Sequence, residues 1–372
     1  MDTLSQQPDD LIFLRSLPSL FLREGYVDAY CVYGAAPHTR FQAVANDLEV
    51  LPPALRMLVS LFFLGGRLPR EEAGLVFADD EIAALVRLGL LMEDGEAGDH
   101  VHTGGLVLLS ALGHLMFVPM PAWDPVVYFG DDSAALAIRL SPRRGARCLD
   151  LCAGPGIQAL RASAAGGSVV AVEINPIAIA CADLNIALNS LEDVIEVRQG
   201  DLYDAVRPGE TFDFVSANPP LLPFVPDLPY PFVGHGGADG LAVTRLILRG
   251  LPGALAPGGT AQLIGSCLGD AEGPHPRAEL TAFAEEHGLR VMMTFSARKP
   301  LVPGATMFEG LSRSCSVAGG LDFDTVRERF RAHLETERAD HLYLYFLTVS
   351  RAGRPEFVMT EHYRRPGGFW FR

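Results

Sequence analysis

The sequence lacks several features that would place the protein in a membrane, outside the cell or on a zinc ion. No stretch of its 372 residues contains the roughly 20 consecutive apolar residues that a membrane-spanning helix needs. The N-terminus, Met1-Asp2-Thr3, has no basic region before an apolar run, as a secretory signal would have. The six cysteines include no Cys-x-x-Cys pair, which disfavours a disulfide framework and a zinc site. We therefore expect a cytoplasmic protein with reduced thiols and no membrane partner.

Basic charge is also scarce. The formal net charge is −15, and residues 1–125 hold 7 basic and 17 acidic side chains. Because nucleic-acid binding depends mainly on Lys and Arg contacts with phosphates, this balance disfavours a nucleic-acid partner. The pair His100-x-His102 lies in a polar turn without a nearby third ligand, so no metal site is expected.

Residues 1–122 predict a smaller, mostly helical domain. Its expected helices and strands are Leu55–Phe62, Glu71–Phe77 and Glu81–Leu88, then Leu90–Met92 and Val101–Leu108 around a turn. Three helices and a two-stranded wing are typical of a winged helix. The candidate recognition helix begins with Asp80 and Glu81, so we expect substrate capping or dimerisation, giving a homodimer, in place of DNA binding.

Residues 123–372 predict a second domain, after a linker containing Pro119, Pro121 and Pro125. Strands are expected at Ala146–Leu151, Ser168–Glu173, Val194–Arg198, Phe212–Ala217, Thr260–Ser266, Arg290–Phe295 and His341–Ser350, with helices between them. This alternation indicates an α/β fold with a mostly parallel sheet that binds its ligand at the carboxyl ends of the strands. An insert is expected near residues 297–340, with an amphipathic helix from Phe323 to Leu334.

The loop after the first of these strands contains a glycine turn, Gly154-Pro155-Gly156. Glycine allows a tight turn and close approach of the backbone to a ligand. Glu173, at the end of the second strand, can accept two hydrogen bonds from a ribose diol. The pattern Gly154-x-Gly156-x-x-Ala159 also fits a nicotinamide dinucleotide site.

Three further features argue against the dinucleotide. Asp150, at the tip of the first strand, would repel a pyrophosphate but attract an ammonium group. Asp201, after the third strand, suits the exocyclic amine of adenine. The fourth strand ends in Asn218-Pro219-Pro220.

With these motifs, residues 126–350 resemble class I methyltransferases with a small methyltransferase domain, a group that includes the HemK-like glutamine methyltransferases. The resemblance implies a Rossmann-like, seven-stranded sheet and S-adenosylmethionine as cofactor. It places Asp150 by the methionine moiety, Glu173 at the ribose and Asp201 at the adenine. The segment Tyr128–Ser133 is similar to the one that closes over the methionine end in that family. The expected cofactor residues are Phe129, Asp132, Asp150, Gly154, Gly156, Glu173, Asn175, Asp201, Leu202 and Asn218.

The expected catalytic residues are Asn218, Pro219 and Pro220. The Asn218 side chain and the Pro219 carbonyl can each accept a hydrogen bond from an acceptor nitrogen, while the prolines stiffen the loop. The family usually has Tyr or Phe at the next position, where this chain has Leu221. Phe224, Tyr230 or Phe232 is expected to supply the missing ring to the substrate.

These observations predict N-methylation of a small molecule, an amino acid or a peptide. The alternative is an rRNA or tRNA base, or a protein glutamine, as acceptor. A further alternative is a winged-helix regulator that only binds the cofactor.

Overall fold

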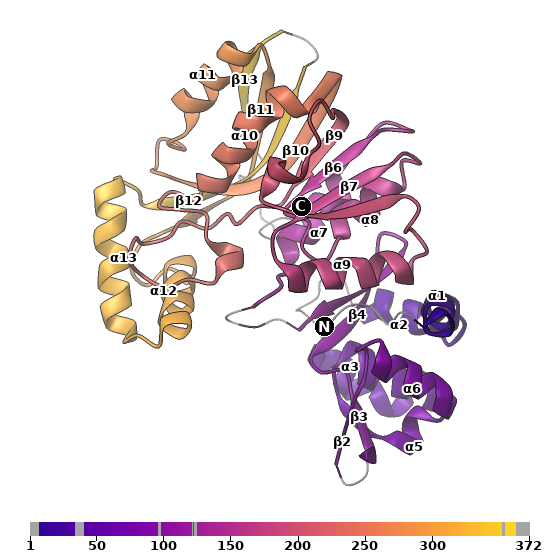
Figure 1. Ribbon diagram of the computed structural model, residues 1–372. Coiled ribbons are helices and arrows are strands. Elements are labelled where there is room, and N and C mark those ends of the chain that lie inside the picture. Colours follow the sequence, from indigo (N-terminus) through magenta and orange to yellow (C-terminus); the bar gives the residue numbers. More distant parts are fainter. Residues whose placement is uncertain are drawn as a thin grey trace.

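The computed structural model describes residues 7–33, 41–95, 98–120, 122, 125–351 and 354–361 (Figure 1). Pro121 of the predicted linker and Trp123, where the second domain was expected to begin, lie outside the described residues. Within the described part of the chain, no helix is both long and apolar enough to cross a bilayer.

The N-terminal region is mostly helical, as predicted. Its helices are α1 (Pro8–Arg23), α2 (Tyr26–Tyr33), α3 (Phe41–Asp47), α4 (Pro53–Leu58), α5 (Arg70–Ala73) and α6 (Asp79–Arg87), with 3-10 turn η1 (Leu48–Val50) and π-helical turn η2 (Val59–Phe63). Strands β1 (Arg67–Pro69), β2 (Met92–Asp94) and β3 (His100–His102) form a small antiparallel sheet in the order β1-β3-β2.

One predicted strand of this region divides into two. The chain turns at Gly104 and Gly105, whose φ angles of 64° and 89° are favourable only for glycine. Residues before the turn form β3 and residues after it form β4 (Leu106–Ala111), which pairs with β5 (His114–Pro119) in a separate hairpin.

The second region is built on an eight-stranded sheet. Its strands are β6 (Cys148–Leu151), β7 (Val169–Glu173), β8 (Ile195–Gln199), β9 (Phe212–Ala217), β10 (Leu255–Gly269), β11 (Arg290–Pro300), β12 (His341–Ser350) and β13 (Glu356–Glu361). The order is β13-β11-β12-β10-β9-β6-β7-β8, and the seven predicted strands are confirmed. The predicted count of seven is wrong, because β13 adds an edge strand parallel to β11.

Helices cover both faces of the sheet (Figure 1). They are α7 (Asp131–Arg139), α8 (Ile157–Ser163) and α9 (Pro176–Leu188) on one face, and α10 (Ala242–Ala254) and α11 (Arg277–His287) on the other. Successive strand residues face opposite sides. Accordingly Val169 packs in the core with α7, α8 and α9, and Val170 in the core with α10 and α11. The first core continues into the N-terminal region, so α9 lies between that region and the sheet.

The strand order reverses beside β6, whose neighbours are β7 on one side and β9 on the other. A crevice forms at the carboxyl ends of strands at such a reversal. The expected insert leaves the sheet between β11 and β12 as two helices, α12 (Thr306–Gly319) and α13 (Phe323–Glu337). Only α13 was predicted, and the pair projects from the sheet away from the N-terminal helices (Figure 1).

Candidate active site

A cavity of about 480 Å³ opens where the strand order reverses. It is lined by side chains from segments 126–133, 152–158, 173–178, 201–202, 218–220 and 232–246. These segments precede α7 or follow β6, β7, β8 and β9, so the motifs at the strand ends meet in one place.

The glycine turn forms one wall of the cavity. Gly154 and Gly156 have φ angles of 55° and 95°, which a residue with a β-carbon adopts only with strain. The N–H of Gly154 donates to Oε2 of Glu173 at 2.8 Å. The Oε1 atom of Glu173 accepts the N–H groups of Ile174 and Asn175, both at 2.9 Å. The Glu173 carboxylate is therefore held in place by the backbone, beside the cavity that it lines.

Asn175 is the N-cap of α9. Its Oδ1 accepts the N–H of Ile177 at 3.0 Å, and Pro176 occupies the first helical position, where no N–H is needed. Its Nδ2 donates to the carbonyl of Val126 at 2.7 Å. Asn175 lines the cavity, but its described hydrogen bonds join protein segments to each other.

Asp150 is buried at the end of β6. Its Oδ1 accepts the hydroxyl of Ser216 on the neighbouring strand β9 at 2.7 Å. Its Oδ2 is buried and has no hydrogen-bond partner among the described residues. Burial raises the pKa of Asp150 to about 7, which the hydroxyl of Ser216 and the backbone of Ala159 only partly offset. A cation beside Oδ2 would remove this electrostatic penalty.

Asn218, at the end of β9, is oriented by the first turn of α7. Its Nδ2 donates to Oδ2 of Asp132 at 3.0 Å and to Oγ of Ser133 at 3.1 Å. The other oxygen of Asp132 accepts the Tyr128 hydroxyl at 2.7 Å. Burial raises the pKa of Asp132, and the hydrogen bonds from Tyr128 and Asn218 act against that shift. Because the Asn218 NH₂ group faces these oxygens, its Oδ1 points elsewhere, and this buried atom has no partner among the described residues.

The expected substrate residues lie at different depths. Leu221 is buried, and its carbonyl accepts the Ser266 hydroxyl. Phe224 and Tyr230 lie behind the cavity wall, with ring centroids 5.5 Å apart. Of the four predicted substrate residues only Phe232 lines the cavity, with 65% of its surface exposed.

An unpredicted ring also reaches the cavity. His235 lines it, and its imidazole lies against the Phe224 ring with centroids 4.1 Å apart. Phe224 therefore contributes to the cavity wall through His235.

The insert supports this substrate segment from behind. Nε2 of His333 on α13 lies 2.9 Å from the carbonyl oxygen of Ala238 and, because a carbonyl only accepts, must be the donor. Ser314 on α12 lies near the Tyr230 hydroxyl. Residues 221–240 thus contact both helices of the insert.

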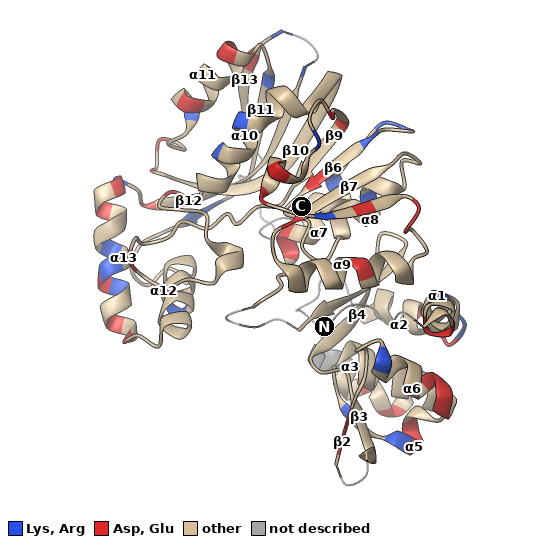
Figure 2. Ribbon diagram, in the orientation of Figure 1, with Lys and Arg blue, Asp and Glu red and all other residues tan. Residues whose placement is uncertain are grey.

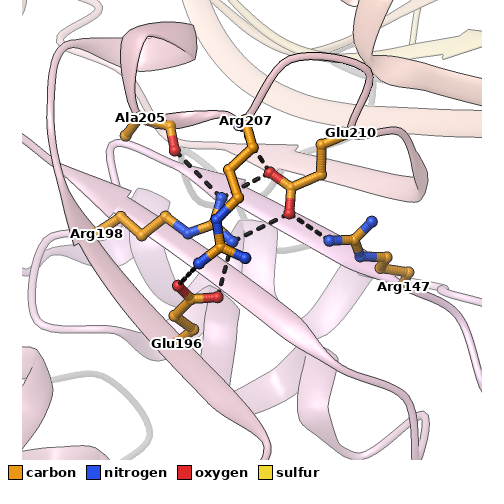
Figure 3. A network of polar contacts seen from close by, with 6 residues as sticks. All are labelled: Arg147, Glu196, Arg198, Ala205, Arg207 and Glu210. Atoms are coloured by element: carbon orange, nitrogen blue, oxygen red, sulfur yellow. Dashed lines mark hydrogen bonds and ion pairs between the residues drawn. The ribbon is translucent and has the colours of Figure 1, made fainter.

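Asp201 and Leu202 line the cavity where the chain leaves β8. Leu202 has a φ angle of 49°, and its loop is fixed by the ion pairs drawn in Figure 3. Arg198 donates to Glu210 at 2.6 Å and 3.0 Å, to Glu196 at 2.7 Å, and to the carbonyl of Ala205 at 3.2 Å. The hydrogen bond from Arg198 lowers the pKa of Glu210 to about 2, so this carboxylate is charged at neutral pH.

The structure brings most of the predicted site residues to the cavity or to its supporting contacts. Phe129 is an exception, because its ring is buried in the apolar core while Tyr128 lines the cavity. Pro219 is buried, and Pro220 lines the cavity. Sequence reasoning missed Ser133, Ser216 and His235. Of these three, only Ser133 could have been found from the sequence, because it directly follows Asp132 in the segment Tyr128–Ser133 that resembles the family.

Comparison with known proteins identifies the family. Residues 129–225 match the methyltransferase small domain. A ribosomal protein uL3 glutamine methyltransferase from Bordetella pertussis is 32% identical over 38% of this chain and 50% of that protein. A candidate protein N5-glutamine methyltransferase from Methanocaldococcus jannaschii is 31% identical over 39% of this chain and 74% of that protein. The chain belongs to the class I S-adenosylmethionine-dependent methyltransferases with a small methyltransferase domain.

The similarity is confined to part of the chain. It spans half the length of the Bordetella protein and 44% of a uL3 glutamine methyltransferase from Bradyrhizobium diazoefficiens. Among solved structures, a SAM-dependent methyltransferase from Agrobacterium tumefaciens is 18% identical with a TM-score of 0.41, over 71% of this chain and 77% of that chain.

The residues present fit the family's cofactor. Asp150 does not line the cavity, but its buried Oδ2 has no hydrogen-bond partner among the described residues and would accept a donor such as the ammonium group of S-adenosylmethionine. The fixed Glu173 carboxylate, which lines the cavity, would accept hydrogen bonds from the ribose hydroxyls, and Asp201 with Leu202 would hold the adenine. The described residues contain no group of three or more His, Cys, Asp or Glu that could hold a metal ion.

Proposed function

We propose that this protein methylates the side-chain amide nitrogen of a glutamine in a protein acceptor, with S-adenosylmethionine as methyl donor. One observation carries the proposal. The Asn218 side chain is fixed with its NH₂ group on Asp132 and Ser133, which leaves a buried, unpartnered oxygen at the end of β9. Such an oxygen requires a donor, and an amide N–H of the acceptor provides one.

The chemistry needs orientation more than activation. The cofactor, when bound, supplies a methyl group on a sulfonium sulfur, which is already a good leaving group. Oδ1 of Asn218 and the carbonyl of Pro219 accept the two N–H groups of the acceptor amide and aim its nitrogen at the methyl carbon. The nitrogen–carbon bond forms, the sulfur–carbon bond breaks and one amide proton is released. The Asn218 and Pro219 oxygens also stabilise the positive charge that develops on the substrate nitrogen.

The relatives favour a protein acceptor over the small molecule that the sequence predicted first. Two of those reported above are named for a ribosomal protein and one for N5-glutamine methylation of proteins. A glutamine amide is small enough to enter a cavity of about 480 Å³ beside a bound cofactor. The exposed rings of Phe232 and His235 at the cavity wall suit the apolar stem and the planar amide of that side chain.

A DNA-binding regulator is disfavoured by the charges of α6, the candidate recognition helix. Its first turn carries Asp79, Asp80 and Glu81 (Figure 2). Its basic residue, Arg87, is held by Asp10 at 2.6 Å and 2.9 Å. A helix with these charges would repel phosphates.

The test is a transfer assay with S-adenosylmethionine labelled in the methyl group and a cell extract separated into protein and small-molecule fractions. We expect label in protein. Acid hydrolysis of an N-methyl amide releases methylammonium, so the label should become volatile as methylamine when the hydrolysate is made basic. Asn218→Ala serves as the inactive control. Label confined to small molecules, or protein label that survives hydrolysis as a methylated amino acid, would contradict the glutamine assignment.

A further inference from the structure

Asn185 on α9 and Asn189, the residue that caps the C-terminus of this helix, bind the open edge of the N-terminal β4–β5 hairpin. Asn185 accepts the N–H of Phe117 at 2.7 Å and donates to its carbonyl at 2.9 Å. Asn189 accepts the N–H of Leu115 at 3.3 Å and donates to its carbonyl at 2.7 Å. Each side-chain amide therefore bonds both the N–H and the carbonyl of one strand residue, as the backbone of a neighbouring strand would.

The distance between Asn185 and Asn189, one helical turn apart, explains why both can pair with the same strand. Residues four apart on a helix are separated by about 6 Å along its axis. Residues two apart on a strand are separated by about 6.7 Å and present their backbone groups to the same edge. The spacing of Asn185 and Asn189 therefore equals that of their partners on β5, Phe117 and Leu115 respectively. The other edge of β5 is paired with β4.

The two asparagines differ in one contact. The second hydrogen of the Asn185 amide donates to the carbonyl of Pro155 at 2.9 Å. Pro155 is the middle residue of the glycine turn, between Gly154 and Gly156 with their positive φ angles. Asn189 instead donates to the Asn185 carbonyl of its own helix at 2.7 Å. Asn185 is completely buried, and its amide makes three hydrogen bonds with backbone groups, with the sulfur of Cys181 at 3.9 Å from its nitrogen.

We propose that Asn185 is a positioning residue through which the N-terminal hairpin holds the glycine turn in its cofactor-binding shape. A single amide joins the Phe117 backbone in the N-terminal region to the Pro155 backbone in the cofactor loop. A shift of β5 therefore displaces the turn, and occupation of the turn restrains β5. The inference rests on the proposed function only in taking the cavity as the cofactor site.

The first test compares Asn185→Ala with the matched variant Asn189→Ala, using calorimetry with S-adenosylhomocysteine and amide hydrogen exchange of the ligand-free proteins. Both variants lose pairing with the hairpin, and both should melt at lower temperature. Only Asn185→Ala should bind S-adenosylhomocysteine about tenfold more weakly, the loss expected for about one hydrogen bond. Only this variant should exchange the Gly156 amide faster, because that amide donates to Ala153 within the turn. Equal effects of both variants, or none from Asn185→Ala, would overturn the proposal.

The second test uses the unaltered protein and stays decisive if Asn185→Ala does not fold. Coupling between two sites is reciprocal. S-adenosylhomocysteine should therefore slow exchange of the Phe117 amide, which is bonded to Asn185, severalfold more than that of the Leu115 amide, which is bonded to Asn189. Equal protection of both amides would overturn the link. If the unaltered protein does not bind the ligand, the proposed function fails, while Gly156 exchange in the two variants still decides the proposal.

Discussion

The two sides of the cavity are built in different ways. On the cofactor side, Glu173 is fixed by backbone N–H groups within two residues of it and in the adjacent glycine turn. On the acceptor side, residues 221–240 contact α12 and α13, and the hydrogen bond from His333 to the Ala238 carbonyl spans 95 residues of sequence. Local bonding makes the glycine turn and Glu173 a recognisable motif, whereas Asp150 on the same side is held by Ser216 across 66 residues of sequence. The acceptor side depends on distant packing, so its specificity leaves no motif in the sequence.

The largest expected effect comes from Asn218→Ala, which removes the oxygen that orients the acceptor. Losing one preorganised hydrogen-bond partner typically lowers turnover by about 10²–10³. The affinity for S-adenosylhomocysteine should stay within about twofold, since the contacts of Glu173 and Asp150 survive. Single-turnover methylation and calorimetry on one preparation distinguish an effect on acceptor orientation from an effect on cofactor affinity. Normal turnover would show that the acceptor is not oriented by Asn218.

Asn218→Asp is not a conservative control. The new carboxylate would face Asp132, which now accepts the Asn218 NH₂ group at 3.0 Å. Two buried carboxylates at that distance repel each other, so we expect this variant to be impaired as strongly as Asn218→Ala.

Glu173→Ala should impair the cofactor side of the cavity. The charged acceptor of the ribose hydroxyls disappears, and hydrogen bonds to charged groups are worth about 1.5–3 kcal/mol. Calorimetry should show S-adenosylhomocysteine binding weakened about ten- to a hundredfold. Circular dichroism serves as the folding control, and unchanged affinity in a folded variant would remove Glu173 from the site.

Asp150 should make cofactor affinity depend on pH. With its pKa raised to about 7, the carboxyl is largely protonated in the free protein below that pH. A bound ammonium favours the ionised form, so affinity should rise about tenfold per unit between about pH 5.5 and 6.5 and level off above about 7.5. Asp150→Asn should flatten this dependence, measured by calorimetry across the same range. A slope that persists in the variant would assign the titration to another group.

The same shift has a consequence for stability. Because the folded protein holds the Asp150 proton more tightly than the unfolded chain, the free energy of unfolding should fall as pH rises from about 4 to about 7. Thermal unfolding of Asp150→Asn should lack this component.

The smallest effect is expected from Phe232→Ala on the acceptor side. Phe232 is 65% exposed at the cavity, so an acceptor would bury only part of its ring, and its KM should rise about fivefold. Val302→Ala is a matched control, since Val302 is 42% exposed and does not line the cavity. Equal KM values for the two variants would exclude Phe232 from acceptor binding.

The parts of this protein that could be predicted from sequence are those with local signals. The buried strands β6, β7 and β9 are apolar runs. Asp150, Glu173 and Asn218 could be placed near one edge of the sheet because each lies at the carboxyl end of a predicted parallel strand. Ser216 and Ser133 could not be placed as partners. They meet Asp150 and Asn218 across 66 and 85 residues of sequence, and only the folded sheet brings them together.

The errors have similar physical causes. The eighth strand, β13, is a short edge strand whose pairing with β11 is set by tertiary structure. The expected contact of Phe224 with the substrate stays a prediction, because its ring contacts Tyr230 and His235 and reaches the cavity only through His235. Aromatic residues in an irregular loop have no periodicity that would show which way they point.

The α12–α13 insert leaves and re-enters the sheet at a single point. Pro300 at the end of β11 is paired with His341 at the start of β12, and the next N–H, that of Leu301, donates to the Asp340 carbonyl at 2.7 Å. The chain between them is therefore a closed loop whose ends already lie together, and its length adds only slowly to the entropy cost of closure. We therefore expect that residues 301–340 can be exchanged for the corresponding segment of another protein without changing the register of β11 and β12, provided that the side chains packed in the core, such as Phe308 and Phe330, are matched. Acceptor preference could then diverge, or be redesigned, in this insert.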